Sequence, residues 1–178
     1  MNFRRFRTKE VLNRLPKKIG VICDIGCGER AEFLFKLNNR IERAIGIDRK
    51  VVELPLGAMG ISQDLNKYPE IDLNIKFDYV TMLAVLEHLE NPERILKEAY
   101  KILKPDGKII ITTPTKRARF VLETLAFLKI IPSVKEHKQY FTRKGLRLLL
   151  LNTGFTNIKH NYFSLGFNQI IIGDKNGN

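Results

Sequence analysis

The chain has 178 residues, of which 44% are hydrophobic and 28% are charged. This length fits one domain with a sizeable core, and the composition excludes a disordered tail protein. No apolar run reaches the roughly 20 residues of a membrane span, and the first ten residues lack the apolar centre of a secretory signal. Two cysteines are too few for a disulfide framework, so we expect a reducing, cytoplasmic setting.

The net charge of +12 is unusual, and half of it lies in residues 1–20, which carry seven basic side chains and one acidic side chain. Such an arm attracts phosphates, anionic lipid headgroups or an acidic substrate. The alternative is a solvated, partly helical leader that aids solubility. We therefore predict a basic leader over residues 1–18, followed by one domain over residues 19–178.

The pattern of apolar residues alternates between short runs typical of strands and longer segments typical of helices. This alternation predicts a mostly parallel sheet covered by helices on both faces, a doubly wound α/β fold. Asn91 followed by Pro92 is a helix start, because Asn caps a helix and Pro suits its first position. The predicted strands span residues 19–24, 44–48, 60–64, 77–83, 108–113, 155–163 and 167–172, the last two forming a hairpin. The predicted helices span residues 30–38, 91–104, 117–131 and 142–152.

The strongest local motif is the turn VICDIGCGERA after the first strand. Gly26 and Gly28 leave room for a ligand to approach the backbone where a parallel strand leads into a helix. The spacing to Ala31 also satisfies the dinucleotide pattern G-x-G-x-x-G/A. Asp24 distinguishes the two nucleotide ligands, because its carboxylate repels a pyrophosphate but suits the ammonium group of S-adenosylmethionine. A glycine turn without a ligand is the third alternative.

Asp48 ends the second predicted strand, 20 residues after Gly28. A carboxylate at this place accepts hydrogen bonds from the ribose hydroxyls of an adenosine. This feature is shared by both nucleotide readings, so it supports an adenosine and not its identity.

Four segments, in order and with suitable spacing, resemble the class I S-adenosylmethionine-dependent methyltransferases over residues 19–172. They are VICDIGCGE, GIDRK, FDYVTMLAVLEHLENPERILKEAYKILKPDGKIIITTP and EHKQYFTRKGLRLLLLNTGF. The third is the most specific and is similar to the branch of ubiquinone-type O-methyltransferases. The resemblance implies a Rossmann-like, seven-stranded sheet with a reversed C-terminal hairpin, and S-adenosylmethionine as the cofactor.

The resemblance also implies the cofactor-binding residues. Asp24, Gly26 and Gly28 would line the methionine end, and Asp48 would bind ribose. The full expected set is Asp24, Gly26, Cys27, Gly28, Asp48, Arg49, Gln63, Asp64, Leu65, Leu83 and Ala84. Arg30 departs from the family pattern, which often has a third glycine there, and we expect its side chain to be exposed.

Some relatives bind a metal through a Glu-x-x-Glu-His run after the fourth strand. Here the run reads Ala84-Val-Leu-Glu87-His88, so one acid is missing and we expect no metal. The Asn/Asp-Pro-Pro-aromatic run of nucleic-acid amine methyltransferases is also absent. This disfavours methylation of adenine or cytosine amines and leaves other nucleic-acid targets open.

The catalytic candidates are His88, just beyond the fourth strand, and His137, before the last helix. Either would serve as a base for an oxygen or carbon nucleophile, while His160 is expected to be structural. The apolar segment over residues 117–131 suits a substrate lid, a dimer interface or a core helix.

The expected reaction is methyl transfer to a small-molecule acceptor, or to one linked to a lipid or glycan, with peripheral contact to an anionic membrane through the leader. The alternatives are a methyltransferase acting on nucleic acid, a nicotinamide-dependent oxidoreductase and a non-catalytic subunit that keeps the fold.

Overall fold

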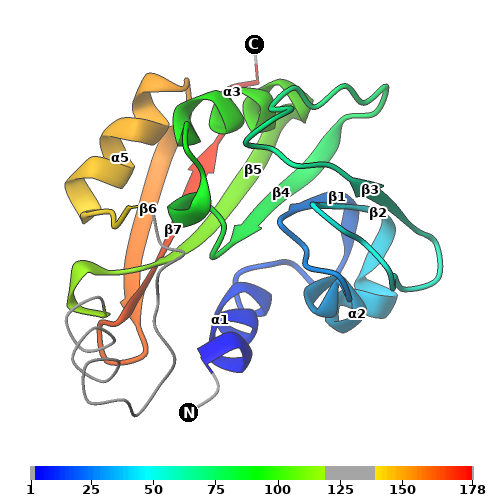
Figure 1. Cartoon of the computed structure of the whole chain (residues 1–178), viewed down its shortest axis with the longest axis horizontal. Helices are drawn as coiled ribbons and strands as arrows, with labels where there is room; N and C mark the ends of the chain where they lie inside the picture. The colour runs from blue at the N-terminus through cyan, green and yellow to red at the C-terminus, as the bar shows by residue number, and fades with distance from the viewer. Residues whose placement is uncertain (1–2, 119–138, 178) are drawn as a thin grey trace.

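The computed structural model describes residues 3–118 and 139–177, which form one seven-stranded sheet (Figure 1). The strand order is β3-β2-β1-β4-β5-β7-β6. The first five strands in this order pair in parallel, and β7 runs antiparallel to both β5 and β6. The predicted sheet with a reversed C-terminal hairpin is confirmed. The strands are β1 (Ile19–Ile25), β2 (Ile41–Asp48), β3 (Ala58–Ser62), β4 (Phe77–Leu83), β5 (Leu103–Pro114), β6 (Thr156–Phe163) and β7 (Asn168–Asp174).

Helices cover both faces of the sheet (Figure 1). Residues of α1 and α2 pack on one face, and residues of α3 and α5 pack on the other. Among the described residues, no helix is long and apolar enough to cross a membrane. The helices are α1 (Phe3–Leu12), α2 (Glu32–Leu37), α3 (Pro92–Ile102) and α5 (Arg143–Asn152), with short 3-10 turns η1 (Asn38–Arg40) and η2 (Leu86–His88).

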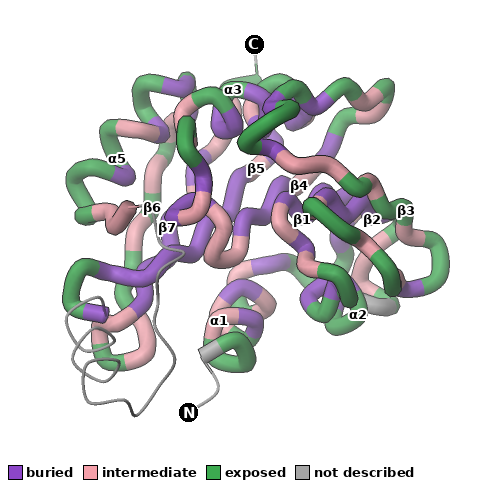
Figure 2. Tube along the Cα trace, in the orientation of Figure 1, coloured by how far each residue is buried: buried purple, intermediate pink, exposed green. Residues whose placement is uncertain are grey.

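The core consists of two apolar clusters, one on each face of the sheet. Side chains along β5 alternate between them: Ile109 and Ile111 join the cluster under α3 and α5, and Ile110 joins the cluster under α1 and α2. All three are at most 1% exposed, and each such burial contributes about 1.5–3 kcal/mol. Figure 2 shows this pattern as buried central strands between more exposed edges. A continuously apolar strand is expected where both faces are covered.

The helix caps follow the sequence, but one helix end does not. Asn91 caps α3 by accepting a hydrogen bond from the backbone N–H of Arg94 (3.1 Å). The helix was expected to reach residue 104, yet it ends at Ile102, and β5 begins at Leu103. Leu103 is buried and pairs with Phe77 of β4. Pairing with a distant strand therefore overrides the helical pattern of the local sequence.

Within the basic segment, α1 packs on the sheet, followed by the turn over residues 13–15. Thr8 and Val11 of α1 and Leu15 just after it are buried, with Val11 fully inaccessible to solvent. Val11 and Leu15 belong to the same apolar cluster as Ile22 of β1. The segment is thus held against the domain by apolar contacts.

Arg40 fixes the end of α1. Its guanidinium group donates to the backbone carbonyls of Leu12 (3.2 Å), Leu15 (2.7 Å) and Pro16 (2.7 Å). Leu12 is the last residue of α1, where a cation is favourable because of the helix dipole, and Leu15 and Pro16 follow the helix. The contact joins segments that lie 24 to 28 residues apart in the chain.

We predict that Arg40→Ala lowers the free energy of unfolding by about 1.5–3 kcal/mol, because charge-assisted hydrogen bonds to several carbonyls are lost. Chemical denaturation measures this change. Arg43→Ala is the matched control, since Arg43 is exposed on β2 and its loss should leave stability unchanged within about 0.5 kcal/mol. Equal stability of the two variants would contradict a role for Arg40 in holding α1.

Candidate active site

Two cavities lie next to each other at the carboxyl ends of the parallel strands. One has a volume of about 380 Å³ and lies between the ends of β2 and β4 and the loop after β3. The other, of about 550 Å³, lies between the turn after β1, the end of β4 and α1. Gly26 and Ala84 line both cavities. The two therefore form one elongated cleft at the edge where doubly wound sheets bind ligands.

The turn after β1 is held tightly against β2 and the loop after β4. Gly26 has φ +76°, and a Cβ there would lie 2.0 Å from Cγ2 of Val85. The backbone N–H of Gly26 donates to the carbonyl of Ile47 (2.6 Å). Gly28 also has a positive φ (+77°), but a Cβ there would meet nothing within 4 Å. The first glycine is required by packing, and the second leaves open space in the cleft.

Cys27 contributes its backbone to this turn, because its side chain points away from the cleft. A Cβ on Gly46 would lie 2.8 Å from the Cys27 sulfur, so the thiol packs against β2. Burial, together with the charges of Asp24 and Asp48, raises the pKa of this thiol to about 12. The thiol is therefore protonated at neutral pH and is not a nucleophile.

Asp24 is 1% exposed and lies at the methionine end proposed from the sequence, where it lines the larger cavity. The hydroxyl of Thr81 on β4 donates a 2.6 Å hydrogen bond to its carboxylate. Burial raises the pKa of Asp24 to about 7; the Thr81 bond opposes this rise, and the charge of Asp48 adds to it. A cation placed beside Asp24 would therefore be neutralised by a carboxylate that is otherwise costly to ionise.

Asp48, at the end of β2, is oriented by the backbone around it. Its two carboxylate oxygens accept hydrogen bonds from the N–H groups of Gly28 (2.8 Å) and Arg49 (2.7 Å). Each oxygen retains a further acceptor position. The pair is therefore arranged to accept two neighbouring hydroxyl groups of a ligand in the smaller cavity, which Asp48 lines.

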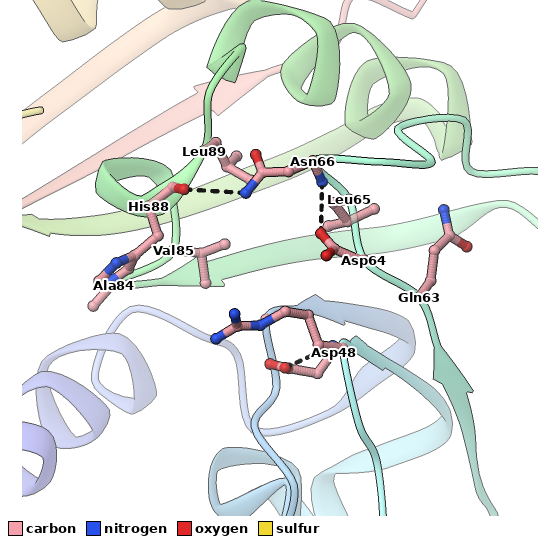
Figure 3. Close-up of a pocket in the computed structure, with 11 residues that line it drawn as sticks. Asp48, Gln63, Asp64, Leu65, Asn66, Ala84, Val85, His88 and Leu89 are labelled. Carbon is pink, nitrogen blue, oxygen red and sulfur yellow. Dashed lines mark hydrogen bonds between the residues drawn. The ribbon is translucent and has the colours of Figure 1, made fainter. Parts of the chain in front are cut away.

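The loop after β3 forms the opposite part of the smaller cavity (Figure 3). Gln63 holds this loop, because its amide donates to the carbonyls of Tyr68 (2.6 Å) and Glu70 (2.8 Å). Asn66 joins it to the loop after β4, donating to the carbonyl of His88 (3.3 Å) and accepting from the N–H of Glu90 (2.8 Å). Sequence reasoning missed Asn66, since its partners lie 22 and 24 residues away.

The loop after β4 is strained where it enters the cleft. Ala84 has φ +59°, a conformation that costs a non-glycine residue about 1–3 kcal/mol and is common at functional sites. Its N–H is held by the carbonyl of Thr112 (2.9 Å). Val85, His88 and Leu89 then line the smaller cavity, and in Figure 3 the imidazole of His88 points towards Ala84. His88 thus lies beside the place where the two cavities meet.

Helix α1 supplies two cations that the sequence analysis did not assign to the site. Arg4 and Arg7 line the larger cavity together with Asp24 and Ala84, and Figure 1 shows α1 beside the end of β4. The Nε atom of Arg7 is buried and has no hydrogen-bond partner among the described residues. Burial lowers the pKa of Arg7, while the charge of Glu87 opposes this effect. The helical spacing of Arg4 and Arg7 from buried Val11 was the signal available in the sequence.

Glu87 lies behind this wall and is fully buried. Neither of its carboxylate oxygens has a hydrogen-bond partner among the described residues. Burial raises its pKa, and its own backbone N–H, His88, Arg7 and the nearby Thr113 hydroxyl oppose the rise. Arg7 therefore lines the larger cavity and also interacts with the charge of the buried Glu87 carboxyl group.

The structure brings the expected cofactor residues together, since all eleven line one of the two cavities. Arg30 is exposed, as expected. His160 contacts Oε1 of Gln169 (2.9 Å) on the neighbouring strand, in keeping with a structural role. His137 and nearly all of the segment over residues 117–131 lie outside the described residues. No cluster of three or more His, Cys, Asp or Glu side chains suited to a metal occurs in the described part of the chain.

Comparison with known proteins places these features in a family. A family model described as a methyltransferase domain matches residues 2–160. The tRNA U34 carboxymethyltransferase of Helicobacter pylori is 28% identical over 160 residues, which cover 76% of this chain and 59% of that protein. The ubiquinone biosynthesis O-methyltransferase of Coxiella burnetii is 24% identical over 127 residues, covering 67% and 54%. The chain thus spans between one half and three fifths of the length of these two relatives.

Solved structures share the fold at lower identity. A chain of the complex between the Haloferax volcanii Trm112 methyltransferase activator and its methyltransferase partner aligns with a TM-score of 0.78, 16% identity, and coverage of 99% of this chain and 92% of that one. The N-methyltransferase NodS of Bradyrhizobium japonicum, in complex with S-adenosyl-L-homocysteine, aligns with a TM-score of 0.67, 15% identity, and coverage of 98% and 88%.

The raised pKa of Asp24 predicts a pH dependence of stability in the protein without ligand. Between its ordinary pKa of 3.8 and about 7, the folded protein retains a proton that the unfolded chain releases. Stability therefore falls as pH rises through this window, by up to about 1.4 kcal/mol per pH unit. Asp24→Asn should remove this part of the decline, because an amide does not titrate in this range. Its oxygen can still accept from Thr81, so the variant should fold. Urea unfolding at several pH values measures it.

The control for this experiment is Asp72→Asn, because Asp72 is exposed and lines neither cavity. This variant should keep the wild-type slope. An unchanged slope in Asp24→Asn as well would mean that another group carries the pH dependence.

Proposed function

The chain belongs to the methyltransferase domain family, and on this premise we propose that it transfers the methyl group of S-adenosylmethionine to a small-molecule acceptor or to one linked to a lipid or glycan. The observation that carries the proposal is the joined cleft, in which Asp24 lines the larger half and Asp48 lines the smaller half. This arrangement matches an elongated ligand that has a cationic end and a sugar.

The smaller cavity suits the adenosine part of the cofactor. Asp48 would accept the two ribose hydroxyl groups with the acceptor positions that its backbone contacts leave free. Leu65, Val85 and Leu89 supply apolar walls for the base. Asp64 accepts the N–H of Asn66 at Oδ1 (3.0 Å), which leaves its second oxygen for the amino group of adenine.

The larger cavity suits the methionine part. Asp24 would face the ammonium group, and Arg4 and Arg7 lie where a carboxylate would be held. A bound ammonium stabilises ionised Asp24, so affinity should rise as pH increases towards 7. A buried carboxylate beneath the glycine turn disfavours the pyrophosphate of a nicotinamide dinucleotide. The same residues therefore favour a methyltransferase over an oxidoreductase.

When bound, the cofactor supplies a methyl group that is already activated by its sulfonium, and the protein positions it. Ala84, whose side chain is a single methyl group, lines both cavities where they meet. His88, which lines the smaller cavity, would accept a proton from an acceptor hydroxyl or carbon acid near this junction, a contribution of about 10²–10⁴-fold in such reactions. The proposed acceptor is therefore methylated at oxygen or carbon.

The names of the relatives leave two acceptor classes, a quinone precursor and a tRNA base. The absence of the Asn/Asp-Pro-Pro-aromatic run disfavours adenine and cytosine amines but does not separate these two classes. Contact with an anionic membrane through the exposed cations Lys9, Lys17 and Lys18 stays a prediction. Mass spectrometric identification of the product formed from fractionated cell extract and methyl-labelled cofactor separates these classes.

We predict that the protein binds S-adenosylhomocysteine and that Asp48→Asn weakens this binding about 10- to 100-fold, because a charged acceptor for the ribose hydroxyls is lost. Asn keeps one oxygen for the N–H of Gly28, so the turn should fold. Calorimetry measures both affinities. Glu42→Gln, an exposed change on the same strand, should bind as the wild type does. Absence of binding by the folded wild type would overturn the proposed function.

For His88, we predict that His88→Ala reduces methyl transfer to extract at least ~100-fold while cofactor affinity changes only a few-fold, because the base acts on the acceptor. Initial rates with saturating labelled cofactor measure the transfer. Asn66 donates to the backbone carbonyl of His88, and His88→Ala keeps this hydrogen bond. A parallel loss of thermal stability and of turnover would assign His88 to structure instead.

A further inference from the structure

A third cavity, of about 430 Å³, lies beyond the end of β5 and apart from the two halves of the cleft. It is enclosed by the residues that follow β5, the start of α5 and the turn between β6 and β7. Figure 1 shows these three segments gathered at the end of the sheet opposite β3. None of the residues that line it lines either half of the cleft. We call it the basic pocket, after Lys116, Arg117 and Arg143 in its wall.

The charge of the basic pocket is of one sign. Lys116, Arg117 and Arg143 line it, and none of the acidic side chains in residues 3–118 and 139–177 does. None of the three forms an ion pair with an acidic residue in the described ranges. All three are exposed, and they surround one concavity. Three cations without counter-charges favour an anion of more than one charge.

The walls of the basic pocket are fixed by hydrogen bonds rather than left as loose loops. Thr115 donates from its backbone N–H to Phe167 (2.9 Å) and from its hydroxyl to Gly166 (2.8 Å). Buried Gln169 donates to the carbonyl of Phe141 (2.8 Å). The cations therefore extend from a rigid frame, and little ordering is needed when a ligand binds.

The rim of the basic pocket is apolar and strained. Leu165 is 86% exposed, and Tyr162 is 53% exposed. Leu165 also has φ +58°, between Ser164 (φ +51°) and Gly166 (φ +82°). An exposed leucine contributes no burial energy, and a left-handed conformation costs a leucine backbone free energy. A turn that keeps it beside three cations is consistent with a binding role.

From these observations we infer that the basic pocket binds the phosphate group of a small phosphomonoester, whose apolar part packs on Tyr162 and Leu165. One arginine side chain can donate two parallel hydrogen bonds to two oxygens of the same phosphate. The two negative charges of a phosphomonoester also balance most of the charge of Lys116, Arg117 and Arg143. The identification of this phosphomonoester as the methyl acceptor rests on the proposed function. The pocket opens at the carboxyl end of β5, next to β4 in the sheet, so that an acceptor held there by its phosphate would extend towards the junction at Ala84.

A nucleic-acid backbone fits this pocket less well. Binding to a strand uses a groove or row of cations along the backbone, often with several aromatic platforms for the bases. Here the cations converge on one cavity, and Tyr162 is the one aromatic ring exposed beside it among the described residues. The arrangement matches a single phosphate better than a chain of phosphates.

The test uses phenyl phosphate, inorganic phosphate and phenol as probes of the full-length protein, by chemical-shift titration. Phenyl phosphate should bind more tightly than inorganic phosphate, and phenol should not bind. Arg143→Gln should weaken phenyl phosphate binding about tenfold through loss of a charge-assisted hydrogen bond. Lys144→Gln removes the same charge from the neighbouring exposed residue, which does not line the pocket, and should change affinity less than twofold.

A second variant tests the apolar rim. Leu165→Asn suits the left-handed backbone, so the turn should fold. It should reduce the preference for phenyl phosphate over inorganic phosphate while leaving inorganic phosphate binding unchanged. Equal weakening by Arg143→Gln and Lys144→Gln would overturn the inference, because attraction would then be general. Tight binding of a short RNA that depends on Arg143, without binding of phenyl phosphate, would overturn it as well.

Calorimetry with S-adenosylhomocysteine keeps this inference separate from the proposed function. The basic pocket variants should bind the cofactor product as the wild type does, because none of the changed residues lines the cleft. Phenyl phosphate binding without cofactor binding would support the phosphate site and refute the methyltransferase proposal. Cofactor binding without phenyl phosphate binding would refute the phosphate site alone.

Discussion

The close contact between Gly26 and Val85 is the constraint on which the cleft depends. A Cβ on Gly26 would lie 2.0 Å from Val85, so the turn after β1 and the loop after β4 can meet only through glycine. The same turn is joined to β2 through Ile47 and Asp48. Three strand ends are thereby held together, and the two halves of the cleft share the residues at this junction. Because both halves are built from backbone turns on rigid strands, a ligand would find its contacts already in place.

Around this junction, titratable groups are buried where their charged forms are disfavoured. Burial raises the pKa values of Asp24 and Glu87 and lowers that of Arg7. Asp24 has one hydrogen bond from Thr81, whereas Glu87 has none within the described ranges. Perturbed groups that line or adjoin a cleft are more common at functional sites than elsewhere. In the proposed function, the ammonium and carboxylate groups of the cofactor would supply the missing counter-charges for Asp24 and Arg7, so that binding and ionisation would be coupled.

The basic character of the chain has more than one location in the structure. Arg4 and Arg7 of α1 line the larger half of the cleft, and Arg40 holds the end of the same helix. A separate cavity is surrounded by Lys116, Arg117 and Arg143. It lies beyond the end of β5, and β3 is at the other edge of the sheet from β6. The net charge of +12 is therefore not explained by a solvated leader alone. Part of it is placed where anionic parts of a cofactor and an acceptor are proposed to bind.

The sequence by itself determined the features that depend on neighbouring residues. The strands, the cap at Asn91, the glycine turn and Asp48 all follow from patterns within a few positions, and the resemblance of four segments implied a seven-stranded sheet with a reversed C-terminal hairpin. Only the tertiary structure brought Arg7 in front of Glu87, joined Asn66 to His88, ended α3 at Ile102 and enclosed the basic pocket. Each of these rests on contacts between residues far apart in the chain, such as Leu103 with Phe77. Local propensity contains no information about such partners, because their proximity exists only once the parallel strands have paired.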